Sequence, residues 1–598
     1  MHHETRSELP SETSSETRTR IVLRLNRDET AFVKSPTVAA LRAAPGAAAA
    51  MASRLADEAA AGLLRRLGRL GRFELVAPAL GDDAGPRGGA GDIEAWLDAA
   101  RRSPDVAAGS HVWTTSDDGV PFVPTGEIFV AFDPTLPARE PSETLARHGL
   151  RLVESRGDGA FVVEVAPGAR NPMAVAAALD AEPGVFLAEP DLASPMVRHR
   201  APGGAGGGGA GGGAGAAEAW HLENAGHHNG TPVGFRAGAD ARVARAWRAL
   251  PGRGRDDIRI AMIDDGFDLA HPDLAGRCAA SHDFTRRGPD VSPDWGDWHG
   301  TACAGLALGG GAAGAPVGAA PGARLVALRW GRDLSDREVE AWLDHAGRCE
   351  AAILSASWGP AARIYPLSTR KSEAIRRLSR EGREGRGCVV LFSVGAQGRD
   401  FDAPEGDPRR VLNGFAAHPD VVAVTATTSM DELAEGADRG ACLWIAAPAG
   451  GAGGWGVVTS DVSGFVTLPD GRVLHRGEGP GDRVALAGGP SAACALTAGV
   501  CALVLTANPA LTSAELRALL AETARPLPDQ RRDLPPRSAA DGLASGEPAA
   551  GAGRDRRYGH GCVDAYAAVL AASQLPGARA LTFGGDESGC DHLPAPVP

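Results

Sequence analysis

An apolar run followed directly by two acidic residues limits the folds that this chain can adopt. The run Ile258–Ile263 is typical of a buried strand, and Asp264 and Asp265 follow it directly. In α/β proteins the carboxyl ends of parallel strands form the edge at which ligands bind. The sequence therefore predicts an α/β fold in which Asp264 lies at the functional edge of a parallel sheet.

Two further polar residues each open a predicted helix. His299 precedes a run of small residues, and Ser491 precedes the apolar run Ala492–Leu505, which is typical of a buried central helix. A serine hydroxyl is a weak nucleophile at neutral pH, so Ser491 needs a base such as His299. Asp264 would then fix the tautomer of the imidazole. Taken singly, the three residues have structural interpretations as a turn cap, a helix-start residue and a helix N-cap.

Together with their flanking segments, these residues resemble the Asp, His and Ser of the subtilisin-like serine proteases (peptidase S8). The resemblance is to the kexin/furin branch, and it rests on six segments: Trp220–Leu222, Ile263–Asp268, His271–Leu274, His299–Gly305, Ser355–Pro360 and Tyr558–Ala565. It implies a serine endopeptidase that cleaves peptides or proteins through an acyl-enzyme and processes a proprotein or itself. It also implies a substrate cleft lined by Ser357, Trp358 and Gly359.

The resemblance and the composition of the chain predict several parts. These are a disordered N-terminus (1–19), an α/β region of unknown role (20–118), a ferredoxin-like domain (119–200), a Gly/Ala-rich linker (201–217), a subtilisin-like catalytic domain (218–573) and a tail (574–598). The catalytic domain is expected to be doubly wound, with a mainly parallel sheet and helices on both faces. Autoprocessing is expected in the linker.

The ferredoxin-like domain is predicted from a βαββαβ order of strands and helices, in which Asn171 is an N-cap and Pro172 the first helical residue. A unit of this shape ahead of a subtilisin-like protease resembles a propeptide that acts as chaperone and inhibitor. An accessory domain that stays attached is the alternative. In residues 20–118 we expect strands and helices at Ile21–Leu25, Phe73–Val76 (strands), Met51–Leu67 and Ile93–Arg101 (helices).

One departure from the family pattern concerns the oxyanion site. Where the family presents an Asn side chain to the oxyanion, this chain has Ala396, and Pro490 replaces the usual Thr before Ser491. Loss of such a donor lowers kcat by about 10² to 10³, a value measured on a subtilisin. Gln397, which is one methylene longer than Asn, is a candidate substitute, and the N–H of Ser491 remains a donor.

The sequence thus leaves three functions open. The first is an endopeptidase with reduced activity. The second is a catalytically impaired subtilisin fold that binds peptide segments. In the third, the acyl group of the acyl-enzyme is transferred to an amine instead of water, so that peptides are joined.

The composition and short motifs of the chain indicate which ligands and partners to expect. A net charge of −13 argues against a nucleic-acid partner, and no zinc, nucleotide or flavin motif is present. Aspartates gather around the Asp and His segments, so calcium is expected as an optional structural ion, with Asp268, Asp273 and Asp297 as weak candidate ligands. No cofactor is expected to be required. Because Ala361-Ala362-Arg363 follows Pro360, an acidic pocket for basic residues is not expected on that side of the cleft.

Targeting signals and cysteines set the expected compartment. Residues 1–19 contain no secretion signal, and we find no run of about 18 or more apolar residues, so no membrane span is expected. The nine cysteines lack metal-ligand spacing and are predicted to be reduced and mostly buried. The expected compartment is the cytoplasm, with non-classical export as the alternative.

Overall fold

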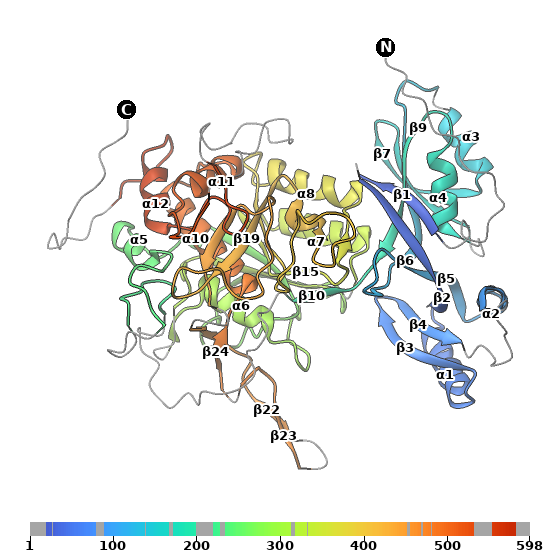
Figure 1. Ribbon diagram of the computed structural model, residues 1–598, viewed down its shortest axis with the longest axis horizontal. Helices are drawn as coiled ribbons and strands as arrows, with labels where there is room; N and C mark the ends of the chain where they lie inside the picture. Colours follow the sequence, from blue (N-terminus) through green and yellow to red (C-terminus); the bar gives the residue numbers. More distant parts are fainter. Residues whose placement is uncertain are drawn as a thin grey trace. The chain divides into compact units, whose positions relative to one another are not determined.

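The computed structural model describes residues 20–26, 28–78, 89–137, 139–166, 171–198, 219–227, 234–312, 317–331, 333–450, 455–467, 471–479, 481–531 and 553–581 (Figure 1). The predictions for residues 1–19 and for the linker 201–217, including autoprocessing there, lie outside the described residues, as does the tail from residue 582. The chain divides into two compact units. Unit 1 is Met1–Met196 with Arg332–Glu340 and Pro360–Ser372, and unit 2 is the remainder.

Unit 2 is built on a seven-stranded sheet in the order β12-β13-β11-β14-β17-β19-β20, and its neighbouring strands run parallel. The strands are β11 (Arg259–Asp264), β12 (Cys278–Asp283), β13 (Arg324–Arg329), β14 (Ile353–Ala356), β17 (Val389–Ser393), β19 (Val421–Thr427) and β20 (Ile445–Pro448). Every residue of β14, β17, β19 and β20 is buried. Near-continuous apolar strands are typical of a parallel sheet covered on both faces.

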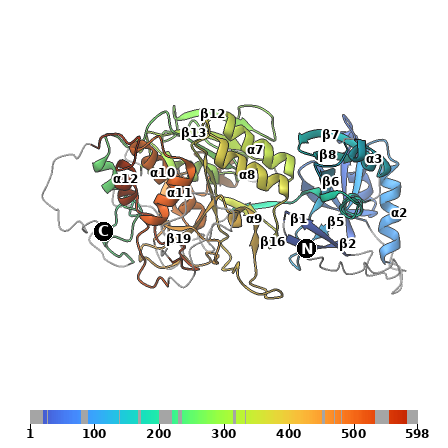
Figure 2. The ribbon, with the colours of Figure 1, turned by 90° about the horizontal axis from the view of Figure 1, so that it is seen from above.

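Helices cover both faces of this sheet, as predicted. On β17, Val389 and Leu391 belong to the core that surrounds α10 (Pro490–Ala507), whereas Phe392 packs against Trp358, which contacts Trp342 of α7 (Asp336–Arg348). The other helices are α5 (Val243–Ala249), α6 (His299–Leu308), α8 (Thr369–Glu381), α9 (Gly414–Ala417), α11 (Ser513–Glu522) and α12 (Ala565–Ser573). Figures 1 and 2 show α7 and α8 side by side, and Arg377 pairs with Asp344 between them at 2.8 Å.

Helix α10 corrects one statement made from the sequence. It is 18 residues long and apolar enough to cross a membrane by length and composition alone, so an apolar run of that length is present. All 18 residues are buried inside the fold. Its composition is therefore accounted for by its place in the core of unit 2.

Several short strands add to these sheets. Three pairs are β10 (Met196–Arg198) with β15 (Trp358–Pro360), β21 (Val457–Ser460) with β24 (Arg483–Ala487), and β22 (Phe465–Thr467) with β23 (Val473–His475). The strands β16 (Ile364–Tyr365) and β18 (Leu412–Asn413) have two residues each.

Unit 1 contains the predicted βαββαβ unit. Its elements are β6 (Val123–Phe132), α3 (Arg139–Arg147), β7 (Leu150–Gly157), β8 (Ala160–Val165), α4 (Pro172–Asp180) and β9 (Val185–Ala193). The sheet order β7-β8-β6-β9 is antiparallel and ferredoxin-like, which confirms the prediction. The predicted N-cap is also confirmed, because the side chain of Asn171 accepts hydrogen bonds from Met173 N and Ala174 N.

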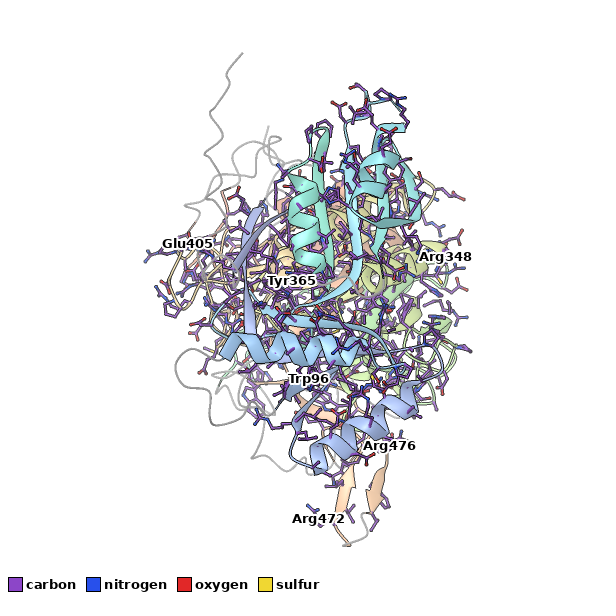
Figure 3. All side chains as sticks on the ribbon, turned by 90° about the vertical axis from the view of Figure 1, so that its right-hand side faces the viewer. Trp96, Arg348, Tyr365, Glu405, Arg472 and Arg476 are labelled. Carbon is purple, nitrogen blue, oxygen red and sulfur yellow. The ribbon has the colours of Figure 1, made fainter. Side chains whose placement is uncertain are left out.

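The N-terminal part of unit 1 is a second sheet, in the order β1-β2-β4-β3 with β5 paired to β2. Trp96, which lies on the second helix of this part, is labelled in Figure 3. Its elements are β1 (Arg20–Leu25), β2 (Asp28–Ala43), α1 (Ala48–Ala60), β3 (Leu64–Leu70), β4 (Phe73–Pro78), α2 (Gly89–Arg101) and β5 (Val106–Thr114). The predicted helix Met51–Leu67 is wrong beyond residue 60. Gly62 takes a left-handed conformation (φ +74°) that ends the helix, and Leu64 and Leu70 are buried where β3 pairs with β4.

Candidate functional site

The first two candidate residues meet at the carboxyl edge of the parallel sheet. Asp264 is the last residue of β11, and His299 is the first residue of α6. The Nδ1 atom of His299 lies 2.8 Å from Oδ1 of Asp264, and both side chains are buried. Burial is the largest single effect and opposes a charged imidazole, but the charge and hydrogen bond of Asp264 together with the contact to Cys303 outweigh it, so the pKa of His299 lies well above its usual value. The pair is thus prepared to hold a positive charge on the imidazole.

The second aspartate, Asp265, holds the start of α6 in place. Its carboxylate accepts hydrogen bonds from His299 N (3.3 Å) and Gly300 N (2.9 Å). Burial and the neighbouring charge of Asp264 raise its pKa to about 7. A Cβ on Gly300 would lie 2.4 Å from the carbonyl oxygen of Gly266, so only glycine allows this close approach of the helix to the strand end.

Ser491 lies in the first turn of the buried helix α10. Gly489 is the N-cap and Pro490 the first helical residue, so the interpretation of Ser491 as an N-cap is wrong. The Oγ of Ser491 donates to the carbonyl oxygen of Ser357 (2.8 Å), and the Oγ of Ser357 donates to the carbonyl oxygen of Ser491 (2.9 Å). This reciprocal pair ties the start of α10 to the chain that leaves β14.

Cys303 joins the two parts of the site, and sequence reasoning gave it no role. Its Sγ lies 3.9 Å from both ring nitrogens of His299, and its thiol also interacts with the side chain of Ser357. Asp264, His299, Cys303, Ser357 and Ser491 therefore form one continuous series of contacts. The signal in the sequence was the spacing: Cys303 follows His299 by four residues on a helix and so shares its face.

The oxyanion turn follows β17. Ala396 is buried there and offers no side-chain donor, while the side chain of Gln397 is exposed. Asp438, which the sequence analysis did not single out, shapes the turn by accepting from Gln397 N (3.1 Å) and Arg399 N (2.8 Å). A Cβ on Gly395 would lie 2.0 Å from Oδ2 of Asp438, so glycine is required at that position.

The predicted cleft residues divide into two groups. Ser357 contacts Ser491 directly, as described above. Trp358 is only 1% exposed, and its Nε1 donates to the carbonyl oxygen of Ile263 (2.9 Å), so its side chain belongs to the core. The backbone of β15, from Trp358 to Pro360, pairs with β10. This segment therefore presents its backbone, not its tryptophan side chain, to a neighbouring strand.

A cation that sequence reasoning missed lies at Asp265. The guanidinium of Arg198, at the end of β10, lies 2.8 Å from Oδ2 of Asp265 and 3.0 Å from Oδ1 of Asp297. It also donates to the carbonyl oxygen of Gly296 at 2.9 Å. The carboxylates of Asp265 and Asp297, which lie near the His299–Asp264 contact, thus bind a basic side chain that comes from the short strand β10.

The aspartates considered for calcium have other partners. Arg329 is 4% exposed and donates to Asp283 (2.8 Å), Asp294 (2.6 Å) and Asp297 (2.8 Å), so a guanidinium already fills the centre of that cluster. The two carboxylate oxygens of Asp273 accept from Ala312 N (2.7 Å) and Ser460 Oγ (3.0 Å). Oδ1 of Asp268 accepts from Ala270 N. Within the described ranges, the oxygen atoms of these carboxylates do not converge into the set of six to eight ligands that calcium requires.

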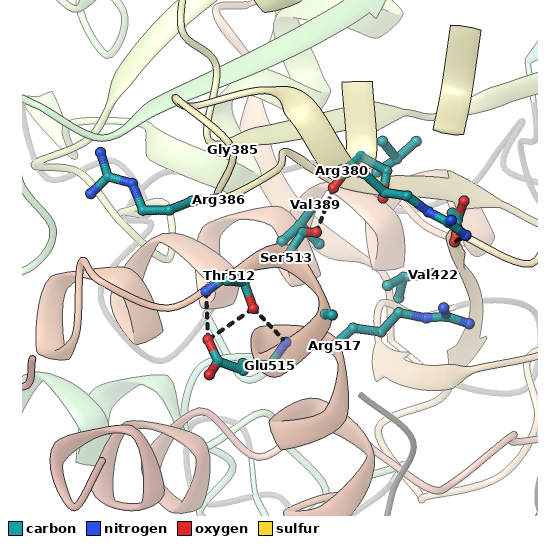
Figure 4. A pocket seen from close by; sticks show the side chains of 13 residues that line it. Arg380, Gly385, Arg386, Val389, Val422, Thr512, Ser513, Glu515 and Arg517 are labelled. Carbon is teal, nitrogen blue, oxygen red and sulfur yellow. Dashed lines mark hydrogen bonds and ion pairs between the residues drawn. The ribbon is translucent and has the colours of Figure 1, made fainter. Parts of the chain in front are cut away.

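Unit 2 also has a cavity that lies away from the site residues described above. It has a volume of about 510 Å³ and is lined by Val389 and Val422, near the amino ends of β17 and β19, together with the start of α11 (Figure 4). Thr512 and Glu515 form a capping box there, and Ser513 Oγ donates to Ser379 O. Because the candidate triad lies at the carboxyl ends of the strands, this cavity is not part of it.

Comparison with known proteins places the chain in a family. The Subtilase family (Peptidase_S8) matches residues 255–561. The chain is 29% identical over 439 residues to a calcium-dependent protease of Trichormus variabilis, covering 70% of this chain and 61% of that protein. It is 31% identical over 337 residues to neuroendocrine convertase 2 of Caenorhabditis elegans, a protein of the kexin/furin branch, covering 53% of this chain and 46% of that protein.

Solved structures are also similar. Fervidolysin from Fervidobacterium pennivorans, a keratinolytic enzyme related to subtilisin, has a TM-score of 0.49 and 18% identity, covering 76% of this chain and 62% of that one. The chain spans about half to three-fifths of the length of the curated relatives named above. The family match extends over half of the sequence and includes the strands of the parallel sheet, Asp264 at the end of β11, and His299 and Ser491 on α6 and α10, so the chain belongs to the subtilase family, peptidase S8.

Proposed function

We propose that the protein is a serine endopeptidase. The observation that carries the proposal is the buried 2.8 Å contact between His299 Nδ1 and Asp264 Oδ1, joined through Cys303 and Ser357 to the hydroxyl of Ser491. In the proposed reaction His299 takes the proton of Ser491 as its oxygen attacks the peptide carbonyl. The proton then passes to the leaving amine, and water hydrolyses the acyl-enzyme.

The developing negative charge has two supports in this proposal. The N–H of Ser491 is one donor, and the positive end of the α10 dipole is the other contribution. Ala396 supplies no third donor. We therefore expect turnover below that of a subtilase with an asparagine at this position.

We further propose that the ferredoxin-like part of unit 1 acts as an intramolecular chaperone and inhibitor. Two acidic residues of β9 support this role. Glu189 accepts from Thr369 N (2.7 Å), the first residue of α8, and Asp191 accepts from Asp336 N (2.6 Å), the first residue of α7. Carboxylates at helix N-termini are stabilising, so Glu189 and Asp191 of β9 stabilise the first turns of α8 and α7. Both helices lie within the family match.

The substrate preference follows from Arg198. We propose that Met196–Arg198 is held like the part of a substrate before the scissile bond, with its backbone on β15 and Arg198 between Asp265 and Asp297. The hydrogen bond from Ala361 N to Pro195 O (2.9 Å) extends this pairing. A basic residue close before the cleaved bond is therefore preferred, and self-cleavage falls after Arg198.

A second function rests on Ala396. A subtilisin fold without the side-chain oxyanion donor can hold a peptide strand on β15 without cleaving it efficiently, and then serves recognition. A fluorophosphonate probe distinguishes the two functions, because only a serine activated by His299 reacts with it quickly. Transfer of the acyl group from the enzyme to an amine would be detected by mass spectrometry as a product with the mass of the ligated peptide.

The test measures the intact mass of purified chain beside Ser491→Ala, with and without the probe. We expect the unsubstituted chain to bind the probe and to yield fragments cut after Arg198, and Ser491→Ala to do neither. Arg198→Ala should slow the cut, whereas Arg248→Ala, at an exposed arginine paired with Glu223, should leave it unchanged. Equal silence of wild type and Ser491→Ala toward the probe would refute the protease proposal and favour peptide binding.

A further inference from the structure

A pocket of about 460 Å³ lies in the N-terminal sheet of unit 1, in the region to which the sequence assigned no role. Its charged lining comes from three elements. Arg42 is near the end of β2, Arg69 is on β3, and Arg72 lies in the turn between β3 and β4. The remaining walls are mainly apolar and include Pro45 and Met51. The pocket therefore combines several cations with an apolar surface.

The one carboxylate in the lining is already used. Glu74 is buried on β4 and accepts from Arg66 at 3.1 Å and from Arg69 at 2.9 Å. Among the residues that the structure describes, neither Arg42 nor Arg72 has an ion pair. The pocket thus holds an excess of positive charge in a chain whose net charge is −13.

One hydrogen-bond donor of Arg42 is left unpaired by the described part of the protein. Its Nε is buried and has no hydrogen-bond partner in the described part of the chain. Burial, followed by the charge of Arg72, lowers the pKa of Arg42, and the charges of Glu164 and Glu127 counter this only in part. A half-buried guanidinium with an unmet donor and a like charge beside it costs stability, which an added anion would recover.

The 510 Å³ cavity of unit 2 makes a useful contrast. It also contains arginines, among them Arg380 and Arg517 (Figure 4). Arg380 pairs with Asp420 at 3.0 Å, and Arg517 stacks on Trp444 with its guanidinium carbon 3.7 Å from the ring centre. Its lining includes two carboxylates, Asp420 and Glu515, beside three arginines. The pocket of unit 1 has one carboxylate beside three arginines and therefore a larger excess of positive charge.

We propose that the pocket lined by Arg42, Arg72 and Met51 binds a small molecule that carries a carboxylate or phosphate group on an apolar body. The planar guanidinium of Arg42 offers paired donors suited to either oxyanion, and Arg72 supplies the second charge. The apolar body of the ligand lies against Met51 and Pro45. This binding site is separate from the residues of the proposed protease reaction, and its test does not depend on peptide cleavage.

The test uses calorimetric titration of the full chain as Ser491→Ala, which prevents self-cleavage. The probes are octanoate, octyl phosphate, inorganic phosphate and octyltrimethylammonium. We expect at least one octyl anion to bind with millimolar or tighter affinity, inorganic phosphate to bind more weakly, and the octyl cation not to bind. The stronger of the two octyl anions identifies the oxyanion that the site prefers.

Two variants and a matched control locate the binding. Arg72→Ala and Arg42→Met should each weaken binding by about tenfold or more, because each removes a charged donor. Arg65→Ala, at an exposed arginine of β3 outside the lining, should leave the affinity unchanged. Without ligand, Arg72→Ala should not lower the Tm, since it relieves repulsion.

Two results would overturn the proposal. The first is that neither octyl anion binds at concentrations up to about 10 mM, because a weaker affinity would not amount to a binding site. The second is that Arg72→Ala and Arg65→Ala bind the octyl anion equally well. If Arg42→Met fails to fold, the exposed Arg72 still decides the question.

Discussion

The substitution Ala396→Asn tests the oxyanion argument most directly. Strands β14 and β17 are neighbours, with Ala356 opposite Phe392, so the chain that leaves β14 at Ser357 runs beside the chain that leads to Ala396. Ser357 in turn contacts Ser491 through two hydrogen bonds. An asparagine at 396 is therefore introduced in the turn next to the strand that holds the proposed nucleophile.

The expected gain follows from the value of one donor. Removing such a side chain from a subtilisin costs about 10² to 10³ in kcat, or roughly 3 to 4 kcal/mol, so adding it should recover up to that amount. The site is tight, because Ala396 is only 5% exposed. Adding three heavy atoms there should cost about 1–3 kcal/mol of folding stability. We expect kcat to rise by about 10² with KM nearly unchanged, since the donor acts mainly on the transition state.

The assay is steady-state cleavage of a fluorogenic peptide with a basic residue close before the cut, together with urea unfolding of each variant. Ser491→Ala gives the background rate. Gln397→Ala, made in the otherwise unchanged chain, reports whether the exposed glutamine already serves as donor. A folded Ala396→Asn protein that reacts with fluorophosphonate but shows no gain in kcat would refute the reasoning.

Three further outcomes follow from buried contacts. Activity should be lost as pH falls through the raised pKa of His299, because the imidazolium cannot accept a proton; Asp264→Asn should move this limb of the kcat/KM profile to lower pH and reduce kcat by roughly 10⁴. Lys371→Met should remove the nearer cation of the buried carboxylate of Asp336 and leave it with Arg370 at 4.0 Å, which should destabilise unit 1 by about 3 kcal/mol in urea unfolding, whereas Lys371→Arg should cost less. Trp358→Ala should cost about 3–5 kcal/mol by the same measurement, with a smaller cost for Trp358→Phe.

Local patterns in the sequence were sufficient for much of the fold. The apolar run before Asp264 predicted a buried parallel strand, and the order of strands and helices around Asn171 predicted the ferredoxin-like unit. Both depend on burial pattern and capping, which act over a few residues. The predicted helix Met51–Leu67 ran too far, because the pairing of Leu64–Leu70 with β4 outweighed helix propensity.

Sequence patterns alone singled out Asp264, His299 and Ser491 as the residues for the proposed protease chemistry, from their segments and their order. What surrounds these residues became apparent only from the folded chain. Arg198 reaches Asp265 from 67 residues away, and Cys303 contacts both His299 and Ser357. Arg329 binds Asp297, one of the three candidate calcium ligands, together with two other aspartates. Such contacts depend on packing between distant segments, and no local pattern of residues encodes which side chain meets which charge.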